Sequence, residues 1–192
     1  MKRYAPDTFS VEKPIGAGRE RVVYRDSNNP ELAVGFFHEY AKEEPEKIKG
    51  RFYLTKIVHG LFPNATPDIH LADSRTQALV TDYIDSEPEN LPIPIEIRKI
   101  RLSISDLGVL VDQAQLNFLR DKSGEVKYIE TFSPWGQITV GEKRGTWFRD
   151  YDPEKILSAI EALTDPLLKH KLTNYLTRLE SLFFEAQNKK HV

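Results

Sequence analysis

Hydrophobic residues in the first 84 positions fall into short runs or alternate with polar residues, a pattern typical of strands. Residues 8–24 (TFSVEKPIGAGRERVVY) predict two short strands around a glycine-rich turn, and residues 32–37 (LAVGFF) predict a third, buried strand. Residues 68–73 (DIHLAD) and 77–84 (QALVTDYI) predict two more.

One segment between these strands has helical spacing. Apolar residues recur at near-helical intervals from Pro45 to Leu61, with Pro45 suited to a first turn and Gly60 to a C-terminal stop. Three strands therefore precede the only helix of this half. That order differs from the alternation of doubly wound α/β proteins, so we expect an α+β fold.

The second half begins with a proline-rich stretch at residues 86–94 (SEPENLPIP), which predicts a linker. Residues 95–107 predict a helix. Two short strands, near residues 117–119 and at 126–131, flank the turn DKSGE. Residues 133–149 contain three glycines and predict a loop or a small hairpin.

Two helices are expected at the C-terminus. Asp152-Pro153 and Asp165-Pro166 each place a capping carboxylate before a proline at the first helical position. An apolar stripe in the last helix indicates a core-facing side.

Composition narrows the class of protein. The 192 residues are 40% hydrophobic and 29% charged, as expected for one domain or two small lobes. No apolar run approaches the roughly 18 residues that cross a membrane, and the N-terminus lacks the apolar stretch of a signal peptide. There is no cysteine, and the net charge of -2 argues against a dedicated nucleic-acid binder. We expect a cytoplasmic protein without a nucleic-acid partner.

Three polar residues have a spacing that suggests chemistry. Asp112 is followed by Asn117 five positions later and by Glu130 thirteen positions after that. Phosphoryl transfer of the kinase type uses one carboxylate to orient the attacking hydroxyl, an amide oxygen for a metal, and a second carboxylate that chelates metal. The three residues match these roles in that order, and the value of the match depends on the surrounding segments.

Together with the segments before it, this spacing resembles the protein-kinase-like superfamily. IGAGRERVVY is similar to the glycine-rich nucleotide loop of that family, with Gly16, Gly18 and Val23 in register. LAVGFF is similar to the strand that normally ends in the ATP-binding lysine. LVTDYI looks like the strand that runs into the hinge, where backbone groups of Asp82 and Ile84 would read the adenine edge.

The resemblance implies ATP and Mg²⁺ as ligands. It also implies a bilobal fold: an N-lobe over residues 1–84 with a five-stranded antiparallel sheet and one helix, and a reduced, mainly helical C-lobe over residues 85–192. Asp112 would be catalytic, and Asn117 and Glu130 would bind the metal. The acceptor would be a hydroxyl of an unidentified protein or small molecule.

The chain departs from the family pattern at several positions. Gly35 stands where the lysine belongs, Tyr53 lies near the position of its glutamate partner, and Glu130 replaces the metal-binding aspartate. No His-Arg precedes Asp112, and no Ala-Pro-Glu segment is found. Small or atypical relatives, such as aminoglycoside phosphotransferases, are closer in size.

Other basic residues are candidates for the missing charge. Arg21 sits where the with-no-lysine kinases carry their displaced lysine. Lys49 and Lys56 flank Tyr53 on one predicted helix face that would look toward the phosphates.

Each of these residues also has a simpler interpretation. Asp112 would cap a turn, Glu130 would pair with a neighbouring base, and the two lysines would be helix-surface charges. The sequence therefore leaves two functions open: an ATP-dependent phosphotransferase, or a pseudokinase that serves as a nucleotide-binding or scaffold module.

Overall fold

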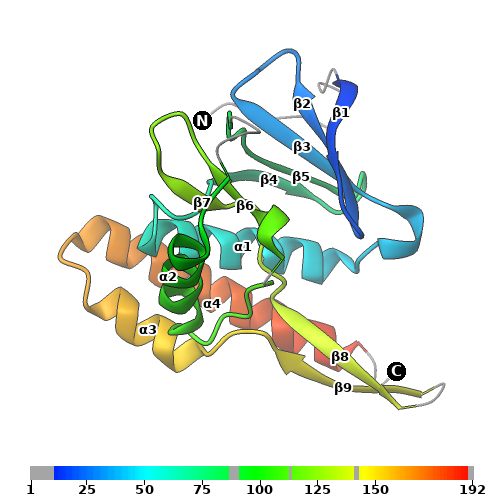
Figure 1. The fold of residues 1–192 in the computed structure, drawn as a ribbon. Coiled ribbons are helices and arrows are strands. Elements are labelled where there is room, and N and C mark those ends of the chain that lie inside the picture. The colour runs from blue at the N-terminus through cyan, green and yellow to red at the C-terminus, as the bar shows by residue number, and fades with distance from the viewer. Residues whose placement is uncertain (1–10, 87–90, 113, 141–142, 190–192) are drawn as a thin grey trace.

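The computed structural model describes residues 11–86, 91–112, 114–140 and 143–189. They form an α+β fold in which a five-stranded antiparallel sheet lies on one side of helix α1 and helix α4 runs along the other side (Figure 1). No helix in these ranges has both the length and the apolar character needed to cross a membrane.

The sheet contains the five strands that the sequence predicted. In spatial order these are β1 (Val11–Ala17), β2 (Arg21–Asp26), β3 (Leu32–Phe37), β5 (Ala78–Asp82) and β4 (Ile69–Asp73). Every neighbouring pair is antiparallel. The predicted start of the first strand at residues 8–10 and part of the predicted linker, residues 87–90, lie outside the described residues.

Helix α1 (Pro45–Leu61) has the predicted bounds and is buried on two sides. Ile48 packs with strand residues beneath the sheet, whereas Leu54 belongs to a larger core on the side of α4. Gly60 lies in the last turn of the helix, one residue before its end at Leu61. A Cβ at Gly60 would lie 2.7 Å from the Leu172 side chain, so this glycine allows α1 and α4 to approach closely.

The remaining elements follow the predicted order. They are η2 (Glu39–Ala41), α2 (Pro94–Ser105), η3 (Gln115–Asn117), β6 (Phe118–Arg120), β7 (Val126–Tyr128), β8 (Trp135–Val140), β9 (Lys143–Arg149), α3 (Pro153–Glu161) and α4 (Pro166–Asn188). Strands β6 and β7 form one hairpin and β8 and β9 another, as expected. The predicted strand at residues 126–131 is shorter, because β7 ends at Tyr128.

Both predicted caps of the C-terminal helices are confirmed. The Asp152 carboxylate accepts the backbone N–H groups of Glu154 and Lys155, and the Asp165 carboxylate accepts those of the second and third residues of α4. Such caps satisfy N–H groups that have no partner within the helix.

The larger core joins α1 to the second half of the chain. It contains Leu54 of α1, Phe118 and Tyr128 of the β6–β7 hairpin, and the fully buried Trp135. The predicted division at residue 84 therefore assigns α1 to the first half, although one of its faces belongs to the core of the second.

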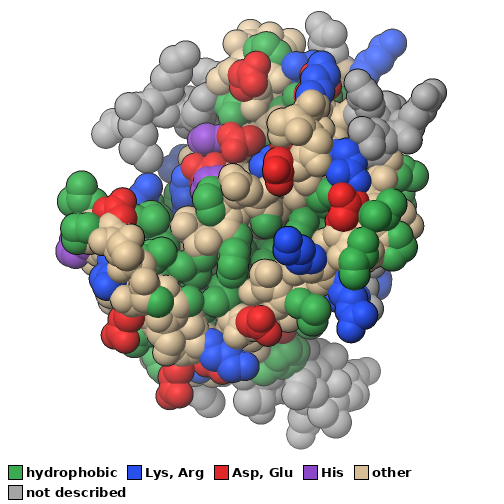
Figure 2. Space-filling view, turned by 60° about the vertical axis from the view of Figure 1, so that its left-hand side comes forward, with side chains coloured by type: hydrophobic (Ala, Val, Ile, Leu, Met, Phe, Trp, Pro, Cys, Tyr) green, Lys and Arg blue, Asp and Glu red, His purple; other side chains and the backbone are tan. Residues whose placement is uncertain are grey.

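The molecular surface carries charges of both signs. Figure 2 shows Lys and Arg side chains interspersed with Asp and Glu side chains around a central area of hydrophobic side chains. Because the signs are mixed among the described side chains of this face, it presents no single-sign field of the kind that attracts a polyanion.

Candidate functional site

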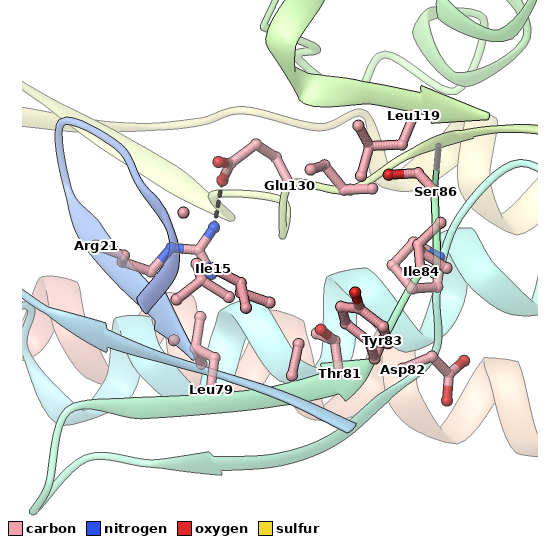
Figure 3. A pocket seen from close by; sticks show the side chains of 16 residues that line it. Ile15, Arg21, Leu79, Thr81, Asp82, Tyr83, Ile84, Ser86, Leu119 and Glu130 are labelled. Atoms are coloured by element: carbon pink, nitrogen blue, oxygen red, sulfur yellow. Dashed lines mark hydrogen bonds and ion pairs between the residues drawn. The ribbon is translucent and has the colours of Figure 1, made fainter. Parts of the chain in front are cut away.

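A pocket of about 210 Å³ opens between the five-stranded sheet and the segment around Glu130 (Figure 3). Ligand pockets typically measure roughly 300–1,000 Å³, so the space enclosed here is below that range and covers at most part of a nucleotide. Its walls come from both halves of the chain: Ile15, Gly16, Arg21, Val23, Ala33, Gly35, Pro67, Leu79, Thr81, Asp82, Tyr83, Ile84, Ser86, Leu119, Ile129 and Glu130.

One end of the pocket is charged. The guanidinium of Arg21 donates a hydrogen bond to the carboxylate of Glu130, and the two side chains point toward each other across the pocket in Figure 3. The Arg21 side chain is 9% exposed and that of Glu130 is 36% exposed. Arg21 also lies over the ring of Phe37, with its guanidinium carbon 5.7 Å from the ring centroid. The rest of the pocket is mainly apolar, so this pair is its chief polar feature.

Gly35 makes room for Arg21. A Cβ on Gly35 would lie 3.5 Å from Arg21 Nη1 and 3.8 Å from Val23 Cγ2. Because β2 and β3 are paired with Val23 opposite Gly35, a long side chain at position 35 would compete with Arg21 for the same space. The absence of a lysine at position 35 and the presence of Arg21 in the pocket are therefore linked sterically.

Asp82 contributes its backbone to the pocket. In Figure 3 its carboxylate points away from the cavity. It accepts hydrogen bonds from His70 Nε2 at 2.7 Å and from the backbone N–H of Asp68 at 2.8 Å. Burial alone would raise the pKa of Asp82, but these hydrogen bonds and the nearby histidines hold it below its usual value. The Asp82 side chain thus anchors β5 to β4 and leaves the backbone facing the pocket.

Backbone groups of Asp112 and Asn117, the other two residues of the predicted constellation, are hydrogen-bonded to the segment that ends at Glu130. The backbone N–H of Asp112 donates to the Tyr128 hydroxyl at 3.3 Å. The carbonyl of Asn117 accepts the N–H of Ile129 at 2.9 Å. Tyr128, Ile129 and Glu130 are consecutive, so Asp112 and Asn117 each contact a residue within two positions of Glu130.

The immediate surroundings of Asp112 fit its simpler interpretation as well. Its carboxylate accepts the backbone N–H of Ala114 at 3.0 Å and the residue is exposed. The short turn it caps is the one that leads into η3 and Asn117. This cap uses only Oδ1 of Asp112, so Oδ2 is left for another partner. Capping is therefore compatible with a reactive carboxylate.

Burial and charge combine at Tyr128. Burial raises the pKa of the Tyr128 hydroxyl well above its usual range, and the negative charges of Glu130 and Asp112 raise it further, although the Asp112 N–H and Arg21 act in the opposite direction. The hydroxyl therefore stays protonated.

Several predicted residues lie elsewhere. Gly18 is in the β1–β2 turn, where its N–H donates to the Arg21 carbonyl. Lys49 is exposed on α1. Lys56 Nζ lies 2.8 Å from both carboxylate oxygens of Asp68. None of the three is among the residues that line the pocket, and neither is Asp112 or Asn117. The two lysines do not face the charged end as the sequence led us to expect.

Sequence reasoning missed Arg51, the most deeply buried charged residue near the pocket. Its side chain is 3% exposed and interacts with residues on both sides of the Arg21–Glu130 pair. A signal was present in the helix pattern, because position 51 lies three residues after the buried Ile48 and four before the buried Thr55. An arginine at a core-facing helix position requires partners, and the sequence did not reveal which.

Among the residues that the structure describes, no group of three His, Cys, Asp or Glu side chains is arranged to hold a metal ion. Mg²⁺ in nucleotide sites is typically held by one or two carboxylates together with substrate phosphates. Glu130 supplies one such carboxylate at the pocket, whereas Asn117 is not among the residues that line it.

A scan against protein-family models finds no match for this chain, and a search of the curated proteins finds no matching sequence. The geometry therefore carries the functional argument. It offers an apolar slot with backbone groups along one edge and, at one end, the Arg21 guanidinium paired with the Glu130 carboxylate.

Proposed function

We propose that this chain is a minimal kinase-like phosphotransferase that binds ATP with Mg²⁺ and transfers phosphate to a hydroxyl group of a protein or small molecule. The main support is the pocket between the two halves of the chain, at whose charged end Arg21 faces Glu130. In this proposal the sheet with α1 forms one lobe and the helical half forms the other, in the bilobal manner of kinase-like proteins.

Each side of the pocket has a role in the proposal. The adenine base occupies the apolar slot beside Thr81 and the backbone of Asp82 and Ile84, and the phosphates extend toward Arg21. Gly16 and Val23 cover the nucleotide from the glycine-rich hairpin. Gly18 supports that cover through its bond to the Arg21 carbonyl, outside the pocket itself.

The residues after the slot would act on the phosphates and on the acceptor. Glu130 and Asn117 would hold Mg²⁺, which neutralises phosphate charge when bound. Asp112, whose side chain is exposed, would accept or orient the acceptor hydroxyl. Arg21 would contact a phosphate oxygen, a task that suits its planar, permanently charged guanidinium.

A second function is favoured by a specific observation. The Glu130 carboxylate already has a cationic partner in Arg21, so a metal would have to displace or share that partner. This favours a pseudokinase, in which the same pocket binds nucleotide without turnover and the protein serves as a binding or scaffold module.

Nucleotide binding is tested by thermal unfolding with and without ATP and Mg²⁺. A ligand at 100 times its dissociation constant adds about 2.7 kcal/mol to the free energy of unfolding, which is readily measured. We expect a shift with ATP and a smaller one when Val23→Phe narrows the slot. Absence of any shift at millimolar ATP would remove both the phosphotransferase and the nucleotide-binding pseudokinase.

Turnover separates the two candidates. ATP hydrolysis and autophosphorylation are compared in the wild type, in Asp112→Asn and in the control Asp106→Asn, an exposed aspartate at the end of α2. Loss of activity in Asp112→Asn alone supports phosphoryl transfer. Binding without turnover in the wild type supports the pseudokinase, and equal activity in all three proteins contradicts the role of Asp112.

A further inference from the structure

Arg51 of α1 is a charged residue in an almost dry environment. Its side chain is 3% exposed and its guanidinium carbon lies 5.3 Å from the centroid of the Phe37 ring. Removing a charged group from water is costly unless partners surround it. The partners of Arg51 therefore indicate why an arginine is kept at this position.

The strongest partner is Glu43, in the segment just before α1. Arg51 Nε and Nη2 donate to its two carboxylate oxygens at 2.6 and 2.7 Å, a bidentate arrangement. Burial would raise the pKa of Glu43, but the hydrogen bonds and charge of Arg51, helped by Lys47, hold it below the usual value. Glu43 is thus a charged and fixed anchor.

Glu43 is itself held in place by the neighbouring strand connection. Its backbone N–H donates to Gln77 Oε1 at 2.9 Å, and its carbonyl accepts from Gln77 Nε2 at 3.1 Å. Gln77 has a φ of 55°, a conformation that non-glycine residues adopt infrequently and that its surroundings must maintain. The anchor of Arg51 is therefore built into the sheet rather than free to move.

The remaining bonds of Arg51 extend to the two segments of the charged end. Nη1 donates to the Thr131 carbonyl at 3.3 Å, and Nη2 donates to the Glu20 carboxylate at 3.2 Å. Thr131 directly follows Glu130, and Glu20 directly precedes Arg21. One guanidinium thus contacts the chain neighbours of both members of the Arg21–Glu130 pair.

We infer that Arg51 is a positioning residue for the phosphate-binding end of the pocket. It holds the glycine-rich turn through Glu20 and the metal-binding segment through Thr131, and thereby sets the separation of Arg21 and Glu130. The expected effect on phosphate binding rests on the proposed function. The contacts of Arg51 with Glu20 and Thr131, which we call the tether, do not depend on any ligand. Small displacements of charged groups are costly in such sites, so their spacing requires a rigid support.

The tether is tested first without ligand, by hydrogen exchange in Arg51→Met, Arg51→Lys and Glu20→Gln. In Arg51→Met, backbone amides of residues 18–22 and 130–132 should exchange about tenfold faster, the equivalent of about 1.4 kcal/mol, while amides of the β4–β5 pair keep their rates. Arg51→Lys keeps the charge but cannot form the forked contacts, so it should resemble Arg51→Met at both segments.

Glu20→Gln keeps the proposal testable if the Arg51 variants fail to fold. The Glu20 side chain is 54% exposed, so its substitution leaves the core intact. It should release the turn at residues 18–22 alone. Two results would overturn the inference that Arg51 joins the two segments. One is that the amides of residues 18–22 exchange at the wild-type rate in Glu20→Gln. The other is that exchange rates in Arg51→Met increase uniformly over the whole protein.

The consequence for ligand binding is tested by comparing ATP with adenosine, which lacks phosphates. In Arg51→Met the affinity for ATP should fall about tenfold while that for adenosine stays within about twofold. A purely structural defect would weaken both ligands alike and would contradict the positioning role.

Arg149 supplies a matched control. It donates to both carboxylate oxygens of Glu180 at 3.0 and 2.6 Å and lies over an aromatic ring, Phe183, outside the pocket. Arg149→Met should leave the ratio of ATP to adenosine affinity unchanged. If the wild type binds neither ligand, the proposed function fails, and the hydrogen-exchange result alone decides whether Arg51 joins the two segments.

Discussion

Arg21 on β2 and Glu130 after β7 form an ion pair although 109 positions separate them in the chain. The pair spans the charged end of the pocket, with the arginine buried and the glutamate partly exposed. Such a contact links the sheet to the β6–β7 region in one place. Its energy and its response to substitution can be measured directly.

A double-mutant cycle with Arg21→Met and Glu130→Gln should give a coupling energy of about 1 kcal/mol in urea unfolding. Fully exposed pairs reach roughly 0.2–1 kcal/mol, and breaking a buried pair costs roughly 3–5 kcal/mol. Because Glu130 is 36% exposed, we expect the coupling energy to lie closer to the values of exposed pairs than to those of buried pairs. A coupling energy of zero would show that the two side chains do not interact in solution.

Two glycines should respond to alanine in opposite ways. A Cβ at Gly35 meets its nearest atom at 3.5 Å, an ordinary contact, so Gly35→Ala should stabilise the strand by roughly 0.5–1 kcal/mol. A Cβ at Gly50 would lie 2.8 Å from Pro134 and from the buried Trp135, so Gly50→Ala should destabilise by about 1–2 kcal/mol despite the better helix propensity. Equal effects in urea unfolding would contradict the packing described at both sites.

The Tyr128 hydroxyl should matter more than an exposed hydroxyl. It accepts the Asp112 N–H within the core, so Tyr128→Phe should cost roughly 0.5–1.5 kcal/mol and should accelerate hydrogen exchange at the Asp112 amide. Tyr40→Phe is the control, because Tyr40 is 77% exposed and donates only to the Arg19 carbonyl at the surface. Its effect should stay within about 0.5 kcal/mol. If Tyr128→Phe and Tyr40→Phe lose the same free energy of unfolding, the hydrogen bond of the Tyr128 hydroxyl does not contribute as described.

Two carboxylates should shape the pH dependence of stability in opposite directions. The folded pKa of Glu43 lies below its ordinary value of 4.5, so its contribution is present above about pH 4.5 and is lost as pH falls through the folded pKa. Glu43→Gln should be less stable at neutral pH and should lose less stability on acidification. Urea midpoints measured between pH 3 and 7 test this.

Asp150 provides the contrasting case. Burial raises its pKa above the ordinary 3.8, and the charges of Lys47 and Arg51 only partly oppose this. Its favourable contribution is present below the unfolded pKa and is lost as pH rises through the folded pKa. Asp150→Asn should therefore be more stable than the wild type at neutral pH, with the difference shrinking at acidic pH. If Asp150→Asn has the same urea midpoint as the wild type at pH 7, the pKa of Asp150 is not raised in the folded protein.

Much of the fold was predictable because it depends on local rules. The apolar run of β3, the bounds of α1 and the caps at Asp152 and Asp165 follow from side-chain period and from backbone groups that need partners nearby. Gly16 of the glycine-rich hairpin and the segment from Asp82 to Ile84 both line the pocket.

The site was only partly predictable. The sequence suggested Lys49 and Lys56 for the charged end because they share a helix face, but Lys56 is held by Asp68 and Lys49 faces solvent. The helix pattern placed Arg51 at a core-facing position but did not reveal its partners, which lie in three other segments. Helical spacing tells which residues share a face and leaves open what that face meets.

The sequence by itself determined the order of strands and helices, the caps, and the candidate roles of Asp112, Asn117 and Glu130, since these depend on residue type and short-range spacing. Only the tertiary structure decided that Arg21 reaches Glu130 over Gly35, and that Arg51 contacts the neighbours of both. These contacts join residues from distant parts of the chain. They are favourable because burial makes an unpaired charge costly, and burial exists only once the sheet, α1 and the Glu130 segment have packed together.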